Sequence, residues 1–431
     1  MEQRAGGRRA AWRTTAEALR HSPGLYRLVT VRFASQFGDG MFQAALGGAI
    51  LFNPERHTDP AAIAAGFAVL LLPYSVLGPF AGALLDRWDR RAVLLWANVL
   101  RGTFILAVAA LLIGGFDESA LFLLALAAVG VSRFVLAGVS ASLPRVVPQK
   151  WLVPTNSVLA TAGSAIAAVG AVCAVVVIGL VGAGDLGSGT AVAVSASGSV
   201  IAAIAAAGFL RGLLGPHRTE SAAPNAIRAV VSGLKTGATA VWHRPGVTTA
   251  MIGIGAHRIV FGVDTLIMLL VLRDTDRHSS LPGGFAGFGV ALAATAAGML
   301  IAAITTPLVI PRIGRSRTVI GGLIVAFAVQ ATFVATLTQA SLLAGAFLLG
   351  FAGQSIKLTG DAAMQIEIDD DRRGQVFALQ DTVFNIAFIA AIAAAATVIP
   401  PDGQSVGLAL GGSVVYAAGL IAVWVNGRRN V

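Results

Sequence analysis

The sequence predicts an all-α membrane protein whose twelve transmembrane helices form two pseudo-symmetric six-helix bundles. Hydrophobic residues make up 56% of its 431 residues and charged residues only 12%, against roughly 25% in an ordinary soluble domain. A helix that spans a bilayer needs about 20 largely apolar residues, so twelve spans take about 240 and leave about 190 for loops and ends. This arithmetic excludes a soluble enzyme and leaves no room for a cofactor-binding domain. We therefore expect neither an enzymatic activity nor a cofactor.

The chain begins with a basic tail. Residues 1–27 contain six arginines, and the first apolar run starts only after them. A cleaved signal peptide has an early, uninterrupted apolar core, so we expect residues 1–27 to remain as a cytoplasmic tail. The segment around Trp12 and Leu19 either lies on the membrane surface as an amphipathic helix or belongs to a disordered basic tail.

Twelve apolar windows bounded by proline, glycine and charged residues follow the tail. The first six cover residues 28–52, 61–85, 92–115, 119–142, 155–181 and 190–212, which define an N-terminal bundle of residues 28–212. The second six cover residues 247–272, 284–310, 318–338, 341–364, 375–399 and 405–426, which define a C-terminal bundle of residues 247–426. Residues 213–246 are expected to form a cytoplasmic linker with an amphipathic helix over 226–242, and residues 427–431 a cytoplasmic tail.

Basic residues are distributed unevenly between the two sides of this arrangement. With both termini inside, 23 Lys and Arg residues fall in cytoplasmic segments, and only Arg56, Arg273 and Arg277 fall outside. The positive-inside rule therefore predicts cytoplasmic N and C termini. The formal charge of +10 is then a topology signal, so nucleic acid is not an expected partner. Few lysines among many arginines, with abundant alanine and glycine, favour the plasma (inner) membrane of a bacterium with a GC-rich genome.

The two bundles resemble each other at a nearly constant offset. Residues 86–91 (DRWDRR) and residues 311–316 (PRIGRS) are separated by the same number of positions as Asp39 and Asp264. The step from Arg133 to Lys357 is one position shorter. Three matches at nearly one offset indicate an internal duplication. Parallel repeats are typical of transporters, which bind substrate near the membrane midplane between the halves.

Polar side chains form a stripe on one predicted helix of each bundle. The stripe of the first span consists of Arg32, Gln36, Asp39 and Gln43, and that of the tenth span of Gln354, Lys357, Asp361 and Gln365. Charges within a bilayer are costly and mark transport pathways, proton relays or ion pairs, so we expect a substrate cavity there. Further expected cavity residues are Arg101, Arg133, Arg258, Asp264, Asp381 and Asn385. The alternative for each charge is a static ion pair or a side chain that extends to the membrane surface.

Proton coupling needs an acid that gains and loses a proton as its surroundings change. Burial favours the neutral form of a carboxyl group, whereas a nearby arginine favours the anion. Asp39 shares the polar stripe with Arg32 and lies near the middle of its span, so it is the first candidate for the proton carrier. Asp264 is the second. The sequence contains no GxxxxGK[ST] loop, so ATP is not the predicted energy source.

One short segment resembles a known signature. Residues 82–95 (GALLDRWDRRAVLL) are similar to the motif G-x-L-x-D-R-x-G-R-R, which the major facilitator superfamily carries between its second and third helices. The matching positions are Gly82, Leu84, Asp86, Arg87, Arg90 and Arg91, whereas Asp89 stands in place of the usual glycine. The resemblance extends over nearly the whole chain and implies the twelve-helix fold of that superfamily.

The same resemblance implies a role for this loop. In the superfamily the loop locks a cytoplasmic gate through its aspartate, so Asp86 and the neighbouring arginines are expected to gate the protein rather than bind substrate. The mirror copy keeps Arg312 and Arg315 but has Pro311 at the acidic position. We therefore expect only the first copy to form the gate ion pair.

Within the superfamily, the chain resembles macrolide-efflux drug/proton antiporters and the related lysophospholipid transporters. The similar features are Arg101, Asn156, residues 142–148 (SLPRVVP) and residues 370–379 (DDRRGQVFAL). The fifth span lacks the Gly-Pro motif that drug antiporters usually carry. By resemblance, Arg133 takes the place of the arginine in helix four that is often assigned to proton transfer, although the following glycine, Gly138, comes one position late.

These features predict a secondary active transporter that exports amphipathic, drug-like molecules by alternating access coupled to protons. One alternative is a transporter of lysophospholipids or other lipids, in which Arg101, Arg133 and Lys357 hold a phosphate. Another is a membrane receptor or scaffold without transport activity, against which the embedded charges count. The expected partners are a small amphipathic substrate or a lipid, protons and membrane lipids, and we expect a monomer.

Overall fold

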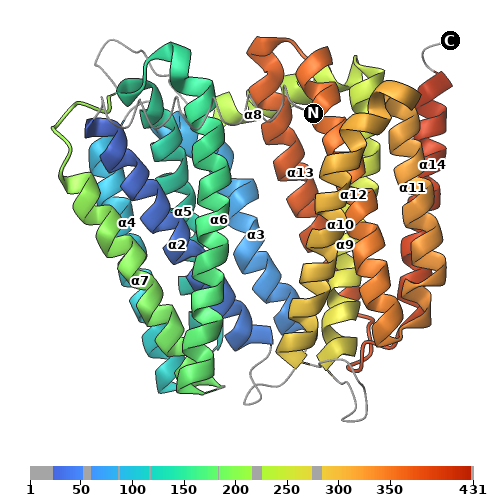
Figure 1. Cartoon of the computed structure of the whole chain (residues 1–431), viewed down its shortest axis with the longest axis horizontal. Helices are drawn as coiled ribbons and strands as arrows, with labels where there is room; N and C mark the ends of the chain where they lie inside the picture. Colours follow the sequence, from blue (N-terminus) through green and yellow to red (C-terminus); the bar gives the residue numbers. More distant parts are fainter. Residues whose placement is uncertain are drawn as a thin grey trace. The chain divides into compact units, whose positions relative to one another are not determined.

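The computed structural model describes residues 23–51, 60–85, 88–115, 118–182, 184–215, 226–273 and 284–428, whose regular secondary structure is helical (Figure 1). The first long helices are α2 (Pro23–Leu51), α3 (Pro60–Leu85), α4 (Arg90–Gly114), α5 (Glu118–Val146), α6 (Gln149–Val181) and α7 (Asp185–Ala207). After α8 (Ala226–Trp242) come α9 (Pro245–Arg273), α10 (Gly284–Ile313), α11 (Arg315–Thr332), the short η1 (Val334–Thr336), α12 (Gln339–Glu367), α13 (Asp370–Ala396) and α14 (Val406–Gly427).

The predicted all-helical membrane fold is confirmed. Ten helices in the described part of the chain are long and apolar enough to cross a bilayer. α2 and α3 are not among the ten, and α2 is the helix that carries the polar stripe of Arg32 and Asp39. The full set of twelve spans therefore stays a prediction.

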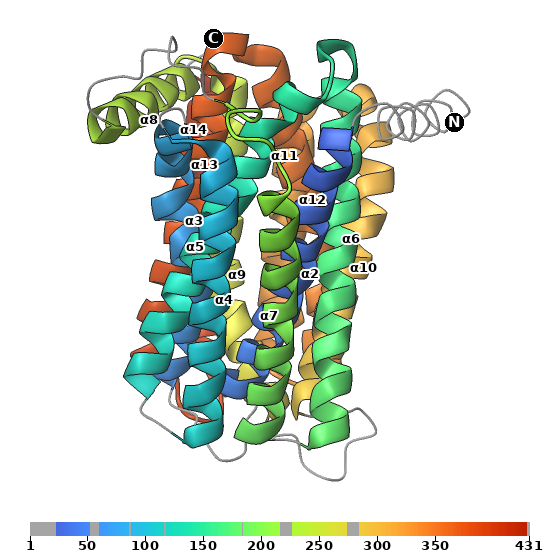
Figure 2. The same cartoon turned by 90° about the vertical axis from the view of Figure 1, so that its left-hand side faces the viewer.

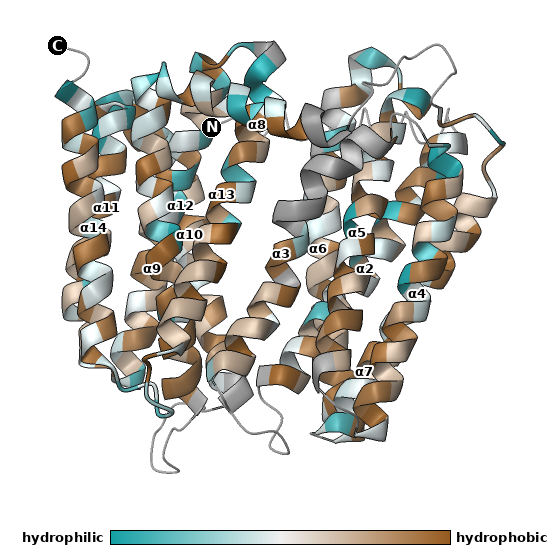
Figure 3. Cartoon of the chain, turned by 180° about the vertical axis from the view of Figure 1, so that it is seen from behind, coloured by the Kyte–Doolittle hydropathy of each residue, from teal (hydrophilic) through white to brown (hydrophobic). Residues whose placement is uncertain are grey.

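The surfaces of these helices suit lipid rather than water. Large apolar side chains are exposed along many helices, and Leu180 at the end of α6 is 82% exposed. Figure 3 shows apolar residues along the middle of the helices and hydrophilic residues mainly towards their ends. Extended exposed apolar surface of this kind marks contact with a membrane or with a partner protein. Together with the length of the helices, it identifies a multi-pass membrane protein.

The chain divides into two compact units, which we describe separately. Unit 1 comprises residues 1–57 and 72–230. Figure 2 shows α4, α7 and α6 side by side on one face of this unit, and α2 packs against both α6 and α7. Apolar residues of α2, α4, α5 and α7, such as Leu28, Leu94, Val139 and Ala202, form one buried cluster. This packing brings the polar residues of α2 against α4, α5 and α7.

Unit 2 comprises residues 58–71 and 231–431. α9 is its central helix, because it packs against α11, α12, α13 and α14. α8 forms over the stretch that the sequence predicts to be amphipathic, and it lies near the start of α13 (Figure 2). Its residues Ala240 and Val241 pack against Met364, Ile368 and Val376.

Two helices end earlier than the apolar windows of the sequence predict. The sixth window, 190–212, is helical only as α7, because the chain turns at Gly208 and Phe209 is buried in the core of unit 1. The ninth window, 318–338, divides into α11 and η1, and Leu337 after η1 has a left-handed backbone with φ of 54°. Apolar periodicity locates a span but does not locate its last turn.

Candidate functional site

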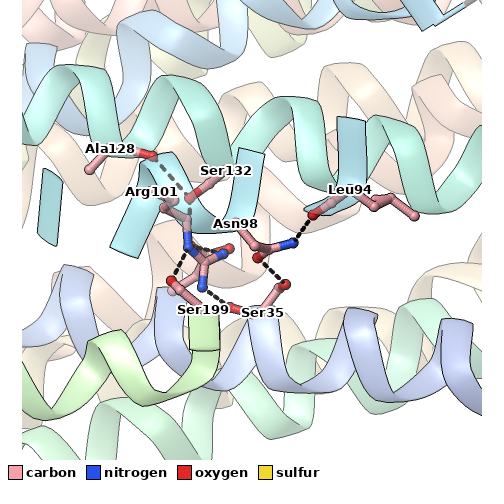
Figure 4. A network of polar contacts seen from close by, with 8 residues as sticks. Ser35, Leu94, Asn98, Arg101, Ala128, Ser132 and Ser199 are labelled. Carbon is pink, nitrogen blue, oxygen red and sulfur yellow. Dashed lines mark hydrogen bonds and ion pairs between the residues drawn. The ribbon is translucent and has the colours of Figure 1, made fainter. Parts of the chain in front are cut away.

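Unit 1 contains a largely buried ion pair between α2 and α4. The guanidinium of Arg101 on α4 lies 3.3 Å from a carboxylate oxygen of Asp39 on α2, measured from NH1 to Oδ1. Ser132 on α5 donates its hydroxyl hydrogen to the same oxygen at 2.7 Å. Figure 4 shows Arg101 and Ser132 approaching each other from separate helices. The negative charge of Asp39 therefore has both a cation and a hydrogen-bond donor.

Arg101 extends this contact into a network. Its Nε donates to the hydroxyl of Ser199 on α7 at 2.8 Å, and its NH2 reaches the carbonyl oxygen of Ser35 at 3.5 Å (Figure 4). The hydroxyl of Ser35 in turn donates to Oδ1 of Asn98 at 3.2 Å. Arg101 is 0% exposed, so it is enclosed by protein and holds four helices of unit 1 together.

A glycine makes this close approach of helices possible. Gly38 precedes Asp39, and a Cβ atom at Gly38 would lie 3.0 Å from NH2 of Arg101 and 2.9 Å from the carbonyl oxygen of Ser195. A side chain there would push α7 and the guanidinium away. The order glycine then aspartate thus lets α2 present its carboxylate at short range.

Unit 2 places its corresponding aspartate in different surroundings. Asp264 on α9 is 5% exposed, and its Oδ1 accepts a hydrogen bond of 2.7 Å from Nε2 of Gln330 on α11. The same nitrogen lies 3.2 Å from the carbonyl oxygen of Ala409 on α14. Among the described residues, no Lys or Arg lies within 4 Å of the carboxylate. Oδ2 of Asp264 and Oε1 of Gln330 are both buried without a donor.

The two units therefore share a pattern but differ in charge. In unit 1 an aspartate on α2 meets a long polar side chain on α4 that also contacts α7, and in unit 2 an aspartate on α9 meets one on α11 that also contacts α14. The partner is the cation Arg101 in unit 1 and the neutral amide Gln330 in unit 2. A buried carboxylate with no cation close by is stable only if it binds a proton or acquires a partner.

His257, which lies on α9 in unit 2, is held in one orientation by its neighbours. Nδ1 of His257 lies 2.8 Å from the hydroxyl of the fully buried Tyr416, and its ring stacks on Phe261 at 5.9 Å between centroids. A Cβ at Gly353 would overlap Nε2 of His257. The imidazole thus fills the space that the missing side chain of Gly353 leaves on α12.

Charged residues of unit 2 gather around a small hollow between α9, α10 and α12. Arg258, Gln354 and Lys357 line it together with His257 and apolar residues. Nζ of Lys357 donates to Oδ2 of Asp361 at 2.7 Å, and Asp381 on α13 interacts electrostatically with Arg258 and Lys357. Among the described residues, no group of three or more His, Cys, Asp or Glu side chains could hold a metal ion.

Comparison with known proteins identifies the family. Residues 28–392 match the sequence model of the Major Facilitator Superfamily. The chain belongs to this superfamily. Proteins described as uncharacterized MFS-type transporters from Mycobacterium tuberculosis and Mycobacterium bovis are each 44% identical to it over 422 residues, which is 97% of this chain and 93% of theirs.

Solved structures agree on the fold. A crystal structure of a mutant of the nucleoside transporter NupG has a TM-score of 0.68 at 15% identity and covers 93% of this chain and 99% of its own. A crystal structure of a POT family transporter with a thioalcohol-conjugated peptide has a TM-score of 0.63 at 14% identity and covers 92% and 95%. These likenesses show the major facilitator fold and do not transfer a substrate.

The signature loop of this major facilitator protein makes backbone contacts inside unit 1. Arg90 and Arg91 at the start of α4 donate to carbonyl groups at distances of 2.6 to 3.3 Å. The acceptors are Leu85, Ala141 and Leu214 for Arg90, and Ala207 and Phe209 for Arg91. Because carbonyl groups at helix ends lack partners within the helix, these bonds join α4 to the ends of α3 and α7. Gly82 lies within α3, and Asp86 and Arg87 lie outside the described residues.

In unit 2 the loop that corresponds to the signature loop forms an ion pair with an acid outside the loop. NH2 of Arg315 lies 2.8 Å from Oε1 of Glu367 at the end of α12, whereas Arg312 donates to the carbonyl of Leu308 on its own helix. Glu367 also lies against the start of α9, since a Cβ at Gly246 would approach its Oε1 to 2.5 Å. The carboxylate thus complements the positive end of that helix. Gating by either loop stays a prediction.

Apart from the exposed Gln365 on α12, the remaining predicted residues of the polar stripes and cavity are buried or partly buried. Arg32 is 7% exposed, and no carboxylate of the described residues lies within 4 Å of it. It lies beside Gln36 and opposite Gly163 of α6, where a Cβ would be 3.5 Å from both side chains. The partly buried residues are Gln43, Arg133, Gln354 and Asn385. Their place in a shared substrate cavity stays a prediction.

Sequence reasoning missed the uncharged members of both clusters. Ser132 and Ser199 complete the network of unit 1, and Gln330 and Tyr416 complete that of unit 2. Gln330 stands alone in an apolar window, which is a usable signal because a buried amide needs partners. The serines carry no such signal, since a serine within a helix also bonds its own backbone.

Proposed function

We propose that this protein is a secondary active transporter that exports amphipathic small molecules by alternating access, and that protons drive the export. Membership of the superfamily supports transport. Proton coupling is supported by one observation, namely that Asp264 is buried beside an amide and has no cation within ion-pair distance among the described residues. In such surroundings a carboxyl group is more stable when it binds a proton. When water or a cation approaches, the anion becomes more stable and the proton can leave.

Asp264 suits this role better than Asp39. Asp39 has Arg101 at 3.3 Å and a hydroxyl donor at 2.7 Å, so its carboxylate is already held by partners on two other helices. A carrier must instead have two protonation states of similar free energy, so that a conformational change can shift it from one to the other. We therefore place Asp264 first and assign Asp39 to the support of unit 1. Arg133, which the resemblance links to proton transfer, is retained as a secondary candidate.

The test compares two kinds of flux in proteoliposomes. We expect Asp264→Asn to lose accumulation of a fluorescent substrate driven by an imposed pH gradient, because asparagine cannot exchange a proton. Exchange of substrate across the membrane without a gradient should persist, since this step needs no net proton movement. Asp402→Asn, the same substitution at an exposed position between α13 and α14, is the matched control and should leave both fluxes intact. Full gradient-driven accumulation by Asp264→Asn would rule out the assignment.

A further inference from the structure

We infer that the hollow between α9, α10 and α12 binds the anionic group of an amphipathic substrate. This inference rests on the proposed function, because it names the class of molecule that is carried. The polar part of its lining consists of His257, Arg258, Thr295, Gln354 and Lys357. Two of these residues, Arg258 and Lys357, are basic, and none of the residues that line the hollow carries a carboxylate.

The size of the hollow fits a head group. Its volume is about 90 Å³, well below the roughly 300–1,000 Å³ of sites that enclose a whole drug-sized ligand. A carboxylate, sulfonate or phosphate occupies such a space, while the apolar part of the molecule extends out of it. Ile254, Phe261 and Met299 provide apolar contacts beside the cations. The wall thus combines the two properties that an anionic amphiphile requires.

Arg258 and Lys357 both retain hydrogen-bond donors that a ligand can use. Arg258 has no carboxylate within 4 Å among the described residues, and its guanidinium can offer paired hydrogen bonds to a carboxylate or phosphate. Lys357 uses one of three donors on Asp361, and its side chain is 41% exposed. An incoming anion can therefore contact both cations from the hollow.

The acids act as competitors from outside the hollow. Asp361 lies one helical turn beyond Lys357 and pairs with it, and Asp381 interacts electrostatically with both cations. Neither acid lines the hollow. Without substrate these carboxylates balance the two positive charges, and a bound anion exchanges with them. This competition predicts opposite effects for acidic and basic substitutions.

His257 shapes the wall without adding charge. Its Nδ1 is engaged with Tyr416 and its Nε2 faces the backbone of α12 at Gly353, so both ring nitrogens are directed at protein. Stacking on Phe261 holds the ring in place. The charge that a ligand meets therefore comes from Arg258 and Lys357.

Binding to the purified full-length protein in neutral detergent tests the inference. The probes are anilinonaphthalenesulfonate as the anion and ethidium as the cation, each titrated by fluorescence without a proton gradient. We expect Lys357→Gln and Arg258→Gln each to weaken binding of the anion about tenfold, as expected for loss of a charged hydrogen bond. Asp361→Asn should strengthen it. Matched controls are the exposed Lys235→Gln on α8 and Arg317→Gln on α11, which should change nothing.

The basic and acidic substitutions are expected to change the affinity for the anion in opposite directions. This distinguishes a binding effect from misfolding, because a misfolded Asp361→Asn variant would not bind the anion more tightly. Any of three results would overturn the inference. They are unchanged anion binding in both basic variants, weaker anion binding in Asp361→Asn, and a wild-type protein that binds ethidium more tightly than anilinonaphthalenesulfonate. Displacement by lysophosphatidylglycerol but not by lysophosphatidylcholine would assign the anion to a lipid head group, and displacement by neither would assign it to a non-lipid molecule. Because no gradient is present, these results are independent of proton coupling through Asp264.

Discussion

At the scale of single residues, the most consequential contact in unit 1 is between Asp39 and Arg101. The side chain of Arg101 is fully buried and that of Asp39 is 17% exposed, so the loss of either partner leaves the other charge largely shielded from water and without its counter-ion. The pair gains from hydrogen bonds to Ser132 and Ser199, which use capacity that the ion pair leaves open. Its contribution is therefore to hold α2, α4, α5 and α7 in one arrangement.

Loss of one partner should expose this dependence. We expect Arg101→Ala to lower the free energy of unfolding by about 3 kcal/mol, because it leaves the partly buried Asp39 without its cation. Combining Asp39→Asn with Arg101→Gln should cost less than the sum of the two single changes, since the partners interact directly. Equilibrium denaturation in detergent measures both effects. Arg211→Ala, at an exposed position after α7, serves as control, and an equal loss there would contradict the explanation.

At the scale of helices, α2 approaches its neighbours at glycine positions. A Cβ at Gly40 would overlap the carbonyl oxygen of Ala167 on α6, and one at Gly198 of α7 would overlap that of Ala34. Small residues let helix backbones come close in a membrane, where dispersion contacts and hydrogen bonds provide the stabilisation. The same close approach brings the polar groups of α2 within reach of Arg101 and Ser199.

Substitutions on one helix separate this packing effect from helix propensity. We expect Gly40→Ala to destabilise the protein by about 1–3 kcal/mol, because the added methyl group overlaps backbone atoms that cannot rotate away. Gly47→Ala on the same helix meets nothing within 4 Å and should be neutral or slightly stabilising, since alanine favours the helix. Thermal unfolding of the purified variants distinguishes the two. Similar melting temperatures for both would show that α2 and α6 have freedom to separate.

At the scale of the whole molecule, the duplicated halves have diverged in the charge of one contact. Asp39 on α2 and Asp264 on α9 are related by the repeat offset. The aspartate meets a cation in unit 1 and an amide in unit 2. Duplication thus supplies two equivalent carboxyl positions, and the residue on α4 or α11 decides whether the anion is stabilised.

The predicted orientation can be tested on intact cells. In a Cys173→Ser background, a cysteine at Gln404 between α13 and α14 should react with a membrane-impermeant thiol reagent from outside. A cysteine at Leu210, after α7, should react only once the cells are permeabilised, because 23 basic residues are assigned to the cytoplasmic side. Labelling of Leu210→Cys in intact cells would reverse the orientation.

The sequence by itself determined the class of fold and the family resemblance, and it predicted an internal duplication. Apolar windows of bilayer length, charged residues between them and a repeated loop motif are properties of the chain in order, so no contact map is needed to find them. Asp39, Arg101 and Asp264 were found for the same reason, since charge is conspicuous in an apolar run.

Only the tertiary structure decided what each charge meets. Asp39 shares a helical stripe with Arg32 in the sequence, yet its ion-pair partner is Arg101, which belongs to a different helix, α4. Asp264 looks equivalent to Asp39 in the sequence, yet Gln330 on α11 leaves it without a cation. Helical spacing places neighbours along one helix, whereas the free energy of a buried charge depends on groups that other helices bring within a few ångströms. Those distances depend on close packing at positions such as Gly38, which sequence periodicity does not reveal.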